Sequence, residues 1–345
     1  MKSIKLIHIG VGNVGSTLVR QIIKTTHEVK HSHDVDLIYC GLFTKQAGLF
    51  DPKGLTNKQL SSFPTDSRAE ISDSISQIDK PFILIDTTAS SSTLPLIRDT
   101  LNRGGSVVMS NKKPLSGSLK DFTELQKIGG NNLFYETTVG AGLPVLNTLE
   151  SLISTGDTIN SIQGCFSGTL GFIFSQLEAG YSFSQSVKEA KRRGLTEPDP
   201  RDDLSGMDVA RKVLIMARIL GQKIEIKDIK VQNLCPQNLA GVSVEEFVKG
   251  IDTLDVEYRY KVEEARFKGK VLRYVATITP TSCNVGLEAV DKESGIGRLK
   301  GTDNIIVFNT KRYLENPLII QGPGAGLEVT AAGVYSNILE ACKVL

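Results

Sequence analysis

The fold is decided near the start of the chain, by the stretch Lys5-Leu6-Ile7-His8-Ile9-Gly10-Val11-Gly12-Asn13-Val14-Gly15. Its first five residues predict a buried parallel strand, and a helical pattern follows from about residue 16 to residue 24. Gly10 permits a tight turn, Gly12 lets the backbone approach a pyrophosphate, and Gly15 lets the helix pack closely on the strand. The phosphates would bind at the helix N-terminus, where free N–H groups favour anions. The residues expected to contact a dinucleotide at this turn are Gly10, Gly12, Asn13, Val14 and Gly15.

The end of the second predicted strand bears on the choice of coenzyme. This strand, residues 36–43, is followed by Thr44 and Lys45, and no carboxylate stands there to hold the ribose 2′-hydroxyl of NAD. A hydroxyl and an ammonium are suited instead to the 2′-phosphate of NADP, which favours NADP slightly over NAD. An exposed lysine on an ordinary loop is the alternative interpretation.

The composition is that of a soluble globular protein with room for two domains. Of its 345 residues, 40% are hydrophobic and 23% are charged. The net charge of +2 gives no reason to expect a nucleic-acid partner, and no apolar run approaches the roughly 18 residues that span a bilayer. The first residues show no secretory signal pattern, and the five cysteines show neither metal nor disulfide spacing. We therefore expect a cytoplasmic protein with no membrane partner.

Histidine is confined to the first 33 residues, at positions His8, His27, His31 and His33. We expect the last three in a loop between the first helix and the second strand. The rest of the chain must therefore perform any acid–base chemistry with Lys, Asp, Glu, Tyr or water. We therefore expect neither a nucleophile activated by histidine nor a histidine-rich zinc site in that part of the chain. Without such a base, Cys165 is better explained as a buried structural thiol than as a nucleophile.

Polar residues follow the later strands of the first domain. The strand at residues 82–86 is followed by Thr87 and Thr88, and the strand at residues 106–110 is followed by Lys112 after one asparagine. The carboxyl ends of such strands line the ligand crevice of an open α/β sheet, so we expect these side chains near the cofactor. The turn Glu136 to Pro144 presents carbonyl oxygens beside a carboxylate, which suits an oxygen-coordinated cation.

The second half of the chain contains an acid-rich segment, Glu197 to Lys212, which begins as a proline-broken loop and ends as a helix. On that helix Asp208 and Lys212 are four residues apart, so their side chains meet on one face. A carboxylate beside an ammonium suits a small polar substrate that carries an amine and a reacting oxygen. An ordinary ion pair on the surface is the alternative interpretation.

A second glycine-rich turn, Gly322 to Gly326, lies between an apolar strand and the C-terminal helix. This pattern predicts that the chain returns to the nucleotide-binding domain, although a flexible loop without a ligand would look the same. We therefore expect an α/β protein in which residues 1–148 plus 311–345 form a Rossmann-type domain with a doubly wound parallel sheet. Residues 149–310 would form a mixed α/β domain for substrate binding, catalysis and dimerisation.

The sequence resembles the homoserine dehydrogenase family over nearly its whole length. Residues 194–212 are close to that family's signature, and four further segments match in order and spacing: Asn111–Lys112, Glu136–Pro144, Ser167–Thr169 and Gly322–Gly326. The resemblance implies an NAD(P)-dependent oxidoreductase that interconverts L-aspartate 4-semialdehyde and L-homoserine, a step in the biosynthesis of threonine, methionine and isoleucine. It also implies a homodimer. Because the chain stops at Leu345, we expect the short form, without a regulatory domain or a fused aspartate kinase.

The resemblance further implies roles for individual residues. Lys112 and Lys212 would face the reacting carbonyl between nicotinamide and substrate, and Asp208 would position Lys212. The substrate would be bound by Glu197, Asp203, Thr169 and Gly168. Further cofactor contacts would come from Thr44, Lys45, Thr87, Thr88, Lys112, Gly322 and Gly324. A monovalent cation, usually sodium, would be held by Glu136, Val139, Ala141 and Leu143. The sequence departs from the family at Leu195, where many members have a tyrosine, so one hydroxyl contact to the substrate is lost.

Two other functions stay open. One is an NAD(P)-dependent aldehyde dehydrogenase, such as an aspartate-semialdehyde dehydrogenase, which would need Cys165 as its nucleophile. The other is a catalytically inactive NAD(P)-binding sensor, against which the intact set of Lys112, Glu197, Asp208 and Lys212 speaks.

Overall fold

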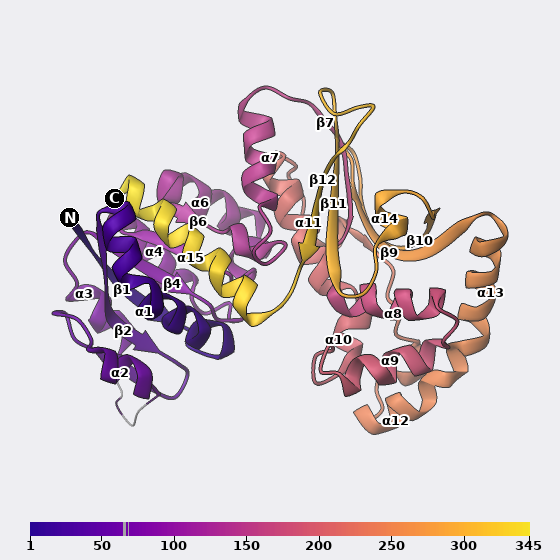
Figure 1. Ribbon diagram of the computed structural model, residues 1–345, viewed down its shortest axis with the longest axis horizontal. Coiled ribbons are helices and arrows are strands. Elements are labelled where there is room, and N and C mark those ends of the chain that lie inside the picture. The colour runs from indigo at the N-terminus through magenta and orange to yellow at the C-terminus, as the bar shows by residue number, and fades with distance from the viewer. Residues whose placement is uncertain (65–66, 68) are drawn as a thin grey trace. The chain divides into compact units, whose positions relative to one another are not determined.

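The computed structural model describes residues 1–64, 67 and 69–345, which form two compact units (Figure 1). Unit 1 consists of Met1–Gly142 and Gly326–Leu345, and unit 2 consists of Leu143–Ala325. The chain thus returns to unit 1 at Gly326, later than the residue 311 expected from the sequence.

Unit 1 is built on a sheet in the order β3-β2-β1-β4-β5-β6. Its strands are β1 (Lys2–Ile9), β2 (Val35–Phe43), β3 (Gly48–Phe50), β4 (Phe82–Asp86), β5 (Ser106–Met109) and β6 (Leu133–Phe134). Neighbouring strands run parallel, except that β3 pairs with β2 antiparallel at the edge. The long crossovers between parallel strands carry helices, as parallel pairing requires. This arrangement confirms the predicted α/β class and Rossmann-type sheet.

The helices of unit 1 are α1 (Asn13–His33), α2 (Asn57–Ser62), α3 (Ile71–Ser76), α4 (Leu94–Asn102), α5 (Lys113–Ser116), α6 (Leu119–Gly129) and α15 (Leu327–Val344). The prediction that the last three histidines lie in a loop is wrong, because α1 continues to His33. The buried Val29 extends the apolar face of α1 into this polar stretch, and the helix ends where Asp34 adopts a left-handed conformation.

The core of unit 1 joins the two ends of the chain. Leu18 and Ile22 of α1 belong to the same buried cluster as Val334 and Ile338 of α15, together with strand residues such as Leu6. Figure 1 shows the two helices side by side, one indigo and one yellow. Burial of each such side chain stabilises the fold by about 1.5–3 kcal/mol. The last helix is therefore an integral part of the nucleotide-binding unit.

Unit 2 is built on a mostly antiparallel sheet in the order β12-β11-β7-β9-β10-β8. Its strands are β7 (Ile159–Cys165), β8 (Lys230–Val231), β9 (Lys270–Ile278), β10 (Cys283–Asp291), β11 (Asp303–Thr310) and β12 (Leu318–Pro323). The pairing of β12 explains why the chain returns to unit 1 only at Gly326. Ile306 and Phe308 of β11 lie opposite Ile320 and Leu318 of β12, so this apolar strand completes the sheet of unit 2.

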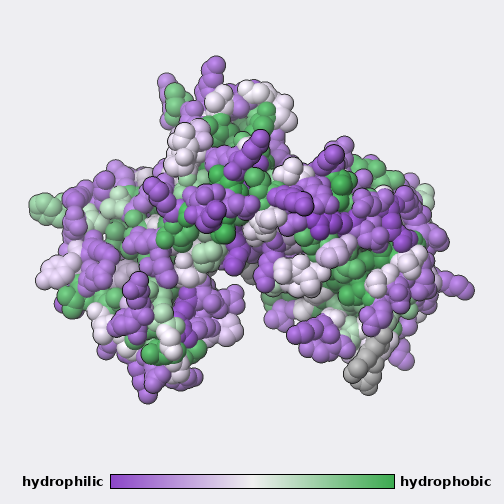
Figure 2. Space-filling view, turned by 180° about the vertical axis from the view of Figure 1, so that it is seen from behind, coloured by the Kyte–Doolittle hydropathy of each residue, from purple (hydrophilic) through white to green (hydrophobic). Residues whose placement is uncertain are grey.

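Helices cover both sides of the sheet of unit 2, with α7 and α11 on one side and α13 and α14 on the other in Figure 1. The helices are α7 (Val145–Ser154), α8 (Gly168–Glu178), α9 (Phe183–Arg192), α10 (Pro200–Leu204), α11 (Met207–Ile219), α12 (Val244–Gly250), α13 (Asp255–Phe267) and α14 (Gly295–Arg298). In the described part of the chain, no helix combines the length and the apolar character needed to cross a membrane. On the face in Figure 2, hydrophobic side chains occur in small groups among hydrophilic ones.

Candidate active site

The glycine-rich turn after β1 is constrained by its neighbours. The N–H groups of Gly10 and Val11 both donate to the carbonyl of Phe43, over 2.8 and 3.0 Å. Gly10 has a φ of +85°, and a Cβ there would lie 2.6 Å from the backbone nitrogen of Thr88. At Gly15 a Cβ would lie 2.9 Å from the Gly10 oxygen. These two positions therefore require glycine for the reasons expected from the sequence.

Gly12 differs from the other two glycines of the turn. The nearest atom to a Cβ at this position would be 3.9 Å away, so the fold itself leaves room for a side chain. Helix α1 begins directly afterwards at Asn13, with no side-chain cap and no acidic residue in its first turn. Its first N–H groups and its positive dipole end are consequently available to an anion.

A hydrogen-bonded network connects the ends of β4 and β5 to this turn. The Thr87 hydroxyl donates to the Gly10 carbonyl over 2.8 Å, and the Thr88 N–H donates to the Asp86 carboxylate over 2.9 Å. The buried amide of Asn111 donates to the other Asp86 oxygen over 3.0 Å. The structure therefore brings both threonines to the edge of the sheet where the turn lies. The sequence did not predict that Asn111 connects the ends of β4 and β5, because this contact depends on the pairing of strands that are distant in the chain.

The remaining predicted cofactor residues of unit 1 lie at the same edge. Lys112 is half-buried and directly precedes α5, one residue after the network's asparagine. Thr44 follows Phe43, the residue whose carbonyl holds the glycine turn, and its hydroxyl oxygen accepts the N–H of Ala47 over 3.0 Å. Lys45 is exposed. An exposed ammonium beside the turn is compatible with binding a phosphate.

The predicted lysine and aspartate pair of unit 2 is formed on α11. The Nζ of Lys212 lies 2.8 Å from a carboxylate oxygen of Asp208 and donates to the carbonyl of Phe166 over 2.6 Å. Lys212 is only 8% exposed, so this is not an ordinary surface ion pair. An ammonium has three N–H donors, and among the described residues only these two acceptors are within hydrogen-bond distance of Nζ. One donor therefore remains for an oxygen of a bound molecule.

Asp203 organises the predicted substrate loop. Its carboxylate accepts the backbone N–H of Glu197 over 2.8 Å, which constrains the backbone of that exposed residue. Thr169, at the start of α8, donates its hydroxyl to the Leu195 carbonyl over 2.5 Å. Burial raises the pKa of Asp203, and the hydrogen bond from the Glu197 backbone opposes that rise only partly. At Leu195 the loop therefore binds Thr169 through its backbone carbonyl. The leucine side chain itself has no hydroxyl group to offer a substrate.

The raised pKa of Asp203 predicts a dependence of stability on pH. The folded protein binds the proton more tightly than the unfolded chain, so ionised Asp203 destabilises the fold at pH values above its folded pKa. This destabilisation disappears as the pH falls through the ordinary aspartate range. We expect Asp203→Asn to have a higher thermal unfolding midpoint than the wild type at about pH 7. The difference should shrink towards about pH 4, and a constant difference would contradict the assignment.

The turn predicted to bind a cation contains two residues in left-handed conformations, Gly140 with φ +77° and Ala141 with φ +55°. Glu136 is buried, and its backbone N–H donates to the Asn337 side chain over 3.1 Å. Val139 is also buried. The reversal of the chain at Gly140 and Ala141 suits a site made of main-chain oxygens. These residues belong to unit 1, whereas Leu143 begins unit 2.

The remaining predicted residues of unit 2 pack against its own backbone. A Cβ at Gly168 would lie 3.0 Å from the carbonyl oxygen of Thr302. Gly322 lies within β12, and Gly324 directly follows that strand, so both belong to unit 2 and not to the nucleotide-binding unit expected from the sequence. Burial raises the pKa of Cys165 to about 12, which keeps this thiol protonated near neutral pH.

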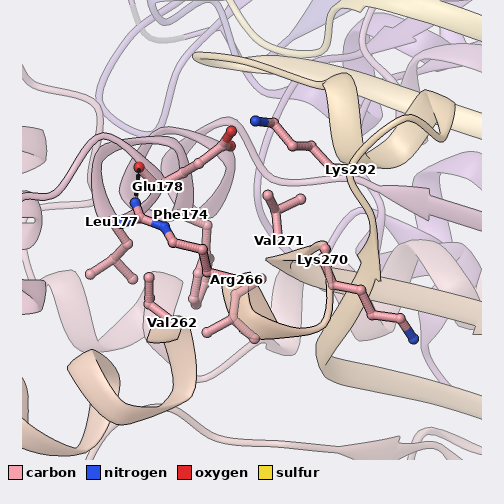
Figure 3. Close-up of a pocket in the computed structure, with 10 residues that line it drawn as sticks. Phe174, Leu177, Glu178, Val262, Arg266, Lys270, Val271 and Lys292 are labelled. Atoms are coloured by element: carbon pink, nitrogen blue, oxygen red, sulfur yellow. Dashed lines mark hydrogen bonds between the residues drawn. The ribbon is translucent and has the colours of Figure 1, made fainter. Parts of the chain in front are cut away.

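A separate cavity of about 270 Å³ lies among α8, α13 and β9 of unit 2 (Figure 3). Apolar side chains such as Phe174 and Val271 line it, and the Glu178 carboxylate at its edge is already paired with Arg273 over 2.6 Å. None of the residues predicted from sequence lines this cavity. The candidate active site is therefore elsewhere in unit 2, around Lys212.

Comparisons with known proteins agree with these features. A profile of the homoserine dehydrogenase family matches residues 144–339. The homoserine dehydrogenase of Schizosaccharomyces pombe is 37% identical, over 96% of this chain and 93% of its own. A bifunctional aspartokinase/homoserine dehydrogenase of Zea mays is 39% identical over 98% of this chain, which spans only 38% of that longer protein.

Solved structures share the fold. The crystal structure of a putative homoserine dehydrogenase from Archaeoglobus fulgidus superposes with a TM-score of 0.81 at 25% identity, covering 99% of each chain. A hyperthermophilic archaeal homoserine dehydrogenase in complex with NADPH has a TM-score of 0.76 at 21% identity, covering 99% of this chain and 98% of its own.

Proposed function

Because this chain belongs to the homoserine dehydrogenase family, we propose that it interconverts L-homoserine and L-aspartate 4-semialdehyde with NAD(P) as hydride carrier. One observation carries the proposal: the buried Lys212 ammonium is held by a carboxylate and a carbonyl, with one donor left for a substrate oxygen. The loop supplies the carboxylate of Glu197 in the same unit, and the backbone of that residue is bonded to Asp203. This set matches a substrate that carries both an amine and a reacting oxygen.

In the proposed mechanism Lys212 acts on the reacting oxygen. The bound nicotinamide supplies or accepts the hydride at the carbon atom. In the reducing direction, the aldehyde oxygen gains negative charge as the hydride arrives, and the Lys212 N–H stabilises that charge and then delivers a proton. Asp208 and the Phe166 carbonyl hold the ammonium in place, so little reorganisation accompanies the reaction. Lys112 polarises and positions the same group.

Substrate recognition is assigned to residues of unit 2. Glu197 would bind the α-amine by charge-assisted hydrogen bonds, and Asp203 supports it through the Glu197 backbone. Thr169 and Gly168 would contact the substrate at the start of α8. Because Leu195 provides no hydroxyl, the substrate would have one possible hydroxyl contact fewer than in relatives with tyrosine.

Coenzyme, cation and assembly are further parts of the proposal. The exposed Lys45 beside the glycine turn favours NADP over NAD. Sodium would be bound by the Glu136 carboxyl group and by main-chain oxygens of Val139, Ala141 and Leu143, where the chain reverses. Gly322 and Gly324 would contact the cofactor. A homodimer formed through unit 2 and a cytoplasmic location complete the proposal, as the family resemblance and the composition favour.

The activity test follows absorbance at 340 nm with purified protein and L-homoserine, in separate cuvettes with NADP⁺ and NAD⁺ at mildly alkaline pH. A rise that requires homoserine supports the proposed reaction, and the faster cuvette identifies the preferred coenzyme. No rise in either cuvette, with a protein that is folded and binds NADPH, would favour the inactive sensor or a different substrate.

The reactivity of the Cys165 thiol distinguishes the proposed reaction from that of an aldehyde dehydrogenase, the alternative function. Because this thiol is buried and its pKa is raised to about 12, iodoacetamide should not alkylate it near pH 8 in the folded protein. We expect Cys165→Ala to retain homoserine oxidation within about threefold, since burial and not reactivity explains the residue. Mass spectrometry of the alkylated protein and the 340 nm assay provide the two measurements. Loss of nearly all activity in this variant would revive the thiol mechanism.

A further inference from the structure

One buried amide in unit 2 has no hydrogen-bond partner. Asn304, the second residue of β11, is 0% exposed, yet neither its side-chain oxygen nor its nitrogen has a partner among the described residues. Buried polar side chains are nearly always hydrogen-bonded, so an exception calls for a reason. The alternate positions Ile306 and Phe308, on the same face of the strand, are apolar. Packing of the sheet therefore does not require a polar residue at position 304.

The register of the sheet places Asn304 close to the catalytic lysine. On one side it pairs with Gly322 of β12. On the other side Ile305 pairs with Cys165, so Asn304 stands opposite Phe166, the next residue after β7. The Phe166 carbonyl is the one that accepts the N–H of Lys212. The unpartnered amide is thus one strand away from the group that holds the ammonium.

The turn after β12 lies directly against this amide. A Cβ built at Gly324 would be 1.8 Å from the Cγ of Asn304 and 1.9 Å from its nitrogen. Only glycine can therefore pass so close to the side chain. The backbone of the turn and the amide are in contact, and no hydrogen bond joins them.

We propose that Asn304 is a positioning residue, whose amide forms hydrogen bonds with the backbone of the Gly322–Gly326 turn when the coenzyme binds. An amide offers both a donor and an acceptor, and it can therefore bind an N–H and a carbonyl of the turn together. The turn fixed in this way contributes to coenzyme binding, while Asn304 itself touches neither coenzyme nor substrate. The inference rests on the proposed function, because that function assigns Gly322 and Gly324 to the coenzyme.

The test compares Asn304→Leu with Asn309→Leu, a matched substitution on the same strand. The Asn309 amide donates to the Ser161 hydroxyl over 3.2 Å, so its replacement removes a bond that already exists. We expect Asn304→Leu to raise the unfolding midpoint of the coenzyme-free protein by about 2–4 °C, because an unsatisfied buried amide is removed. Its Kd for NADPH, from fluorescence titration, should rise about tenfold or more, which corresponds to about 1.4 kcal/mol. At saturating coenzyme, kcat should stay within about twofold.

Asn309→Leu should show the opposite pattern, with a lower unfolding midpoint and an unchanged Kd for NADPH. Asn304→Val serves as a second variant in case leucine does not fit. A lower midpoint together with an unchanged Kd in both Asn304 variants would overturn the proposal and leave Asn304 a structural residue. The titration does not depend on turnover, so a wild-type protein that binds NADPH but does not oxidise homoserine overturns the proposed function alone.

Discussion

Replacing Lys212 by alanine is expected to lower kcat for homoserine oxidation by about 10²–10⁴, the usual contribution of a positioned proton donor. The variant keeps the two acceptors, Asp208 and the Phe166 carbonyl, but it removes the ammonium that both of them hold. The KM for homoserine should change much less than kcat, because the interaction lost is strongest in the transition state. Steady-state rates at 340 nm over a range of homoserine concentrations measure both quantities.

The matched control is Lys261→Ala, which removes another lysine of unit 2 that is paired with a carboxylate four residues away, here Glu257 on α13. Exposed pairs of this kind contribute little, so activity and stability should stay close to those of the wild type. In Lys212→Ala the Asp208 side chain is 49% exposed and can be hydrated, so the fold should be retained. Full activity of a folded Lys212→Ala protein would refute the assignment of Lys212.

The second large effect is expected at Gly12. Apart from its two chain neighbours, no atom of the described residues would be closer than 3.9 Å to a Cβ at Gly12. We therefore expect Gly12→Ala to leave the unfolding midpoint almost unchanged. The same methyl group would occupy the space through which a pyrophosphate approaches the backbone. We therefore expect the Kd for NADPH to rise at least about tenfold, or about 1.4 kcal/mol. Fluorescence titration and thermal unfolding together measure the two effects.

Alanine substitutions at two other glycines serve as controls for this experiment. Gly241→Ala, in a part of unit 2 where a Cβ meets nothing within 4 Å, should change neither stability nor NADPH binding. Gly10→Ala should lower the unfolding midpoint, because its backbone has φ +85° and the Cβ would collide with Thr88. If Gly12→Ala binds NADPH as tightly as the wild type, the glycine turn is not the site of the pyrophosphate.

Much of the fold and of the site was predictable because the signals are local. The glycine spacing from Gly10 to Gly15 is enough to predict the geometry of that turn. The spacing of Asp208 and Lys212 places the two side chains on one helical face. The homoserine dehydrogenase resemblance, carried by short segments such as residues 194–212, is confirmed by the family match. Predictions of this kind need only a few neighbouring residues.

Features that depend on distant pairing were not predictable. The Phe166 carbonyl reaches Lys212 only because α11, which packs on β9 and β10, passes beside the residue that follows β7. No side-chain pattern marks a carbonyl as a ligand. Likewise, the apolar strand before Gly322 has the same pattern whichever sheet it joins, and only the register with β11 assigns it to unit 2. Asn304 left one faint signal, a polar residue directly before the apolar run Ile305–Phe308.

The packing of α15 against α1 has a consequence for how the protein is made. During translation, the first 142 residues of unit 1 leave the ribosome early, but the helix that completes their core is synthesised only after all of Leu143–Ala325. Until α15 is made, the apolar side chains of Leu18 and Ile22 lack the α15 residues that pack against them in the folded protein. Unit 2 is continuous in the chain, so it can finish folding while the earlier segment still waits for its last helix. The nascent chain therefore passes through a stage in which the segment made before unit 2 is still exposed to chaperones after unit 2 has folded.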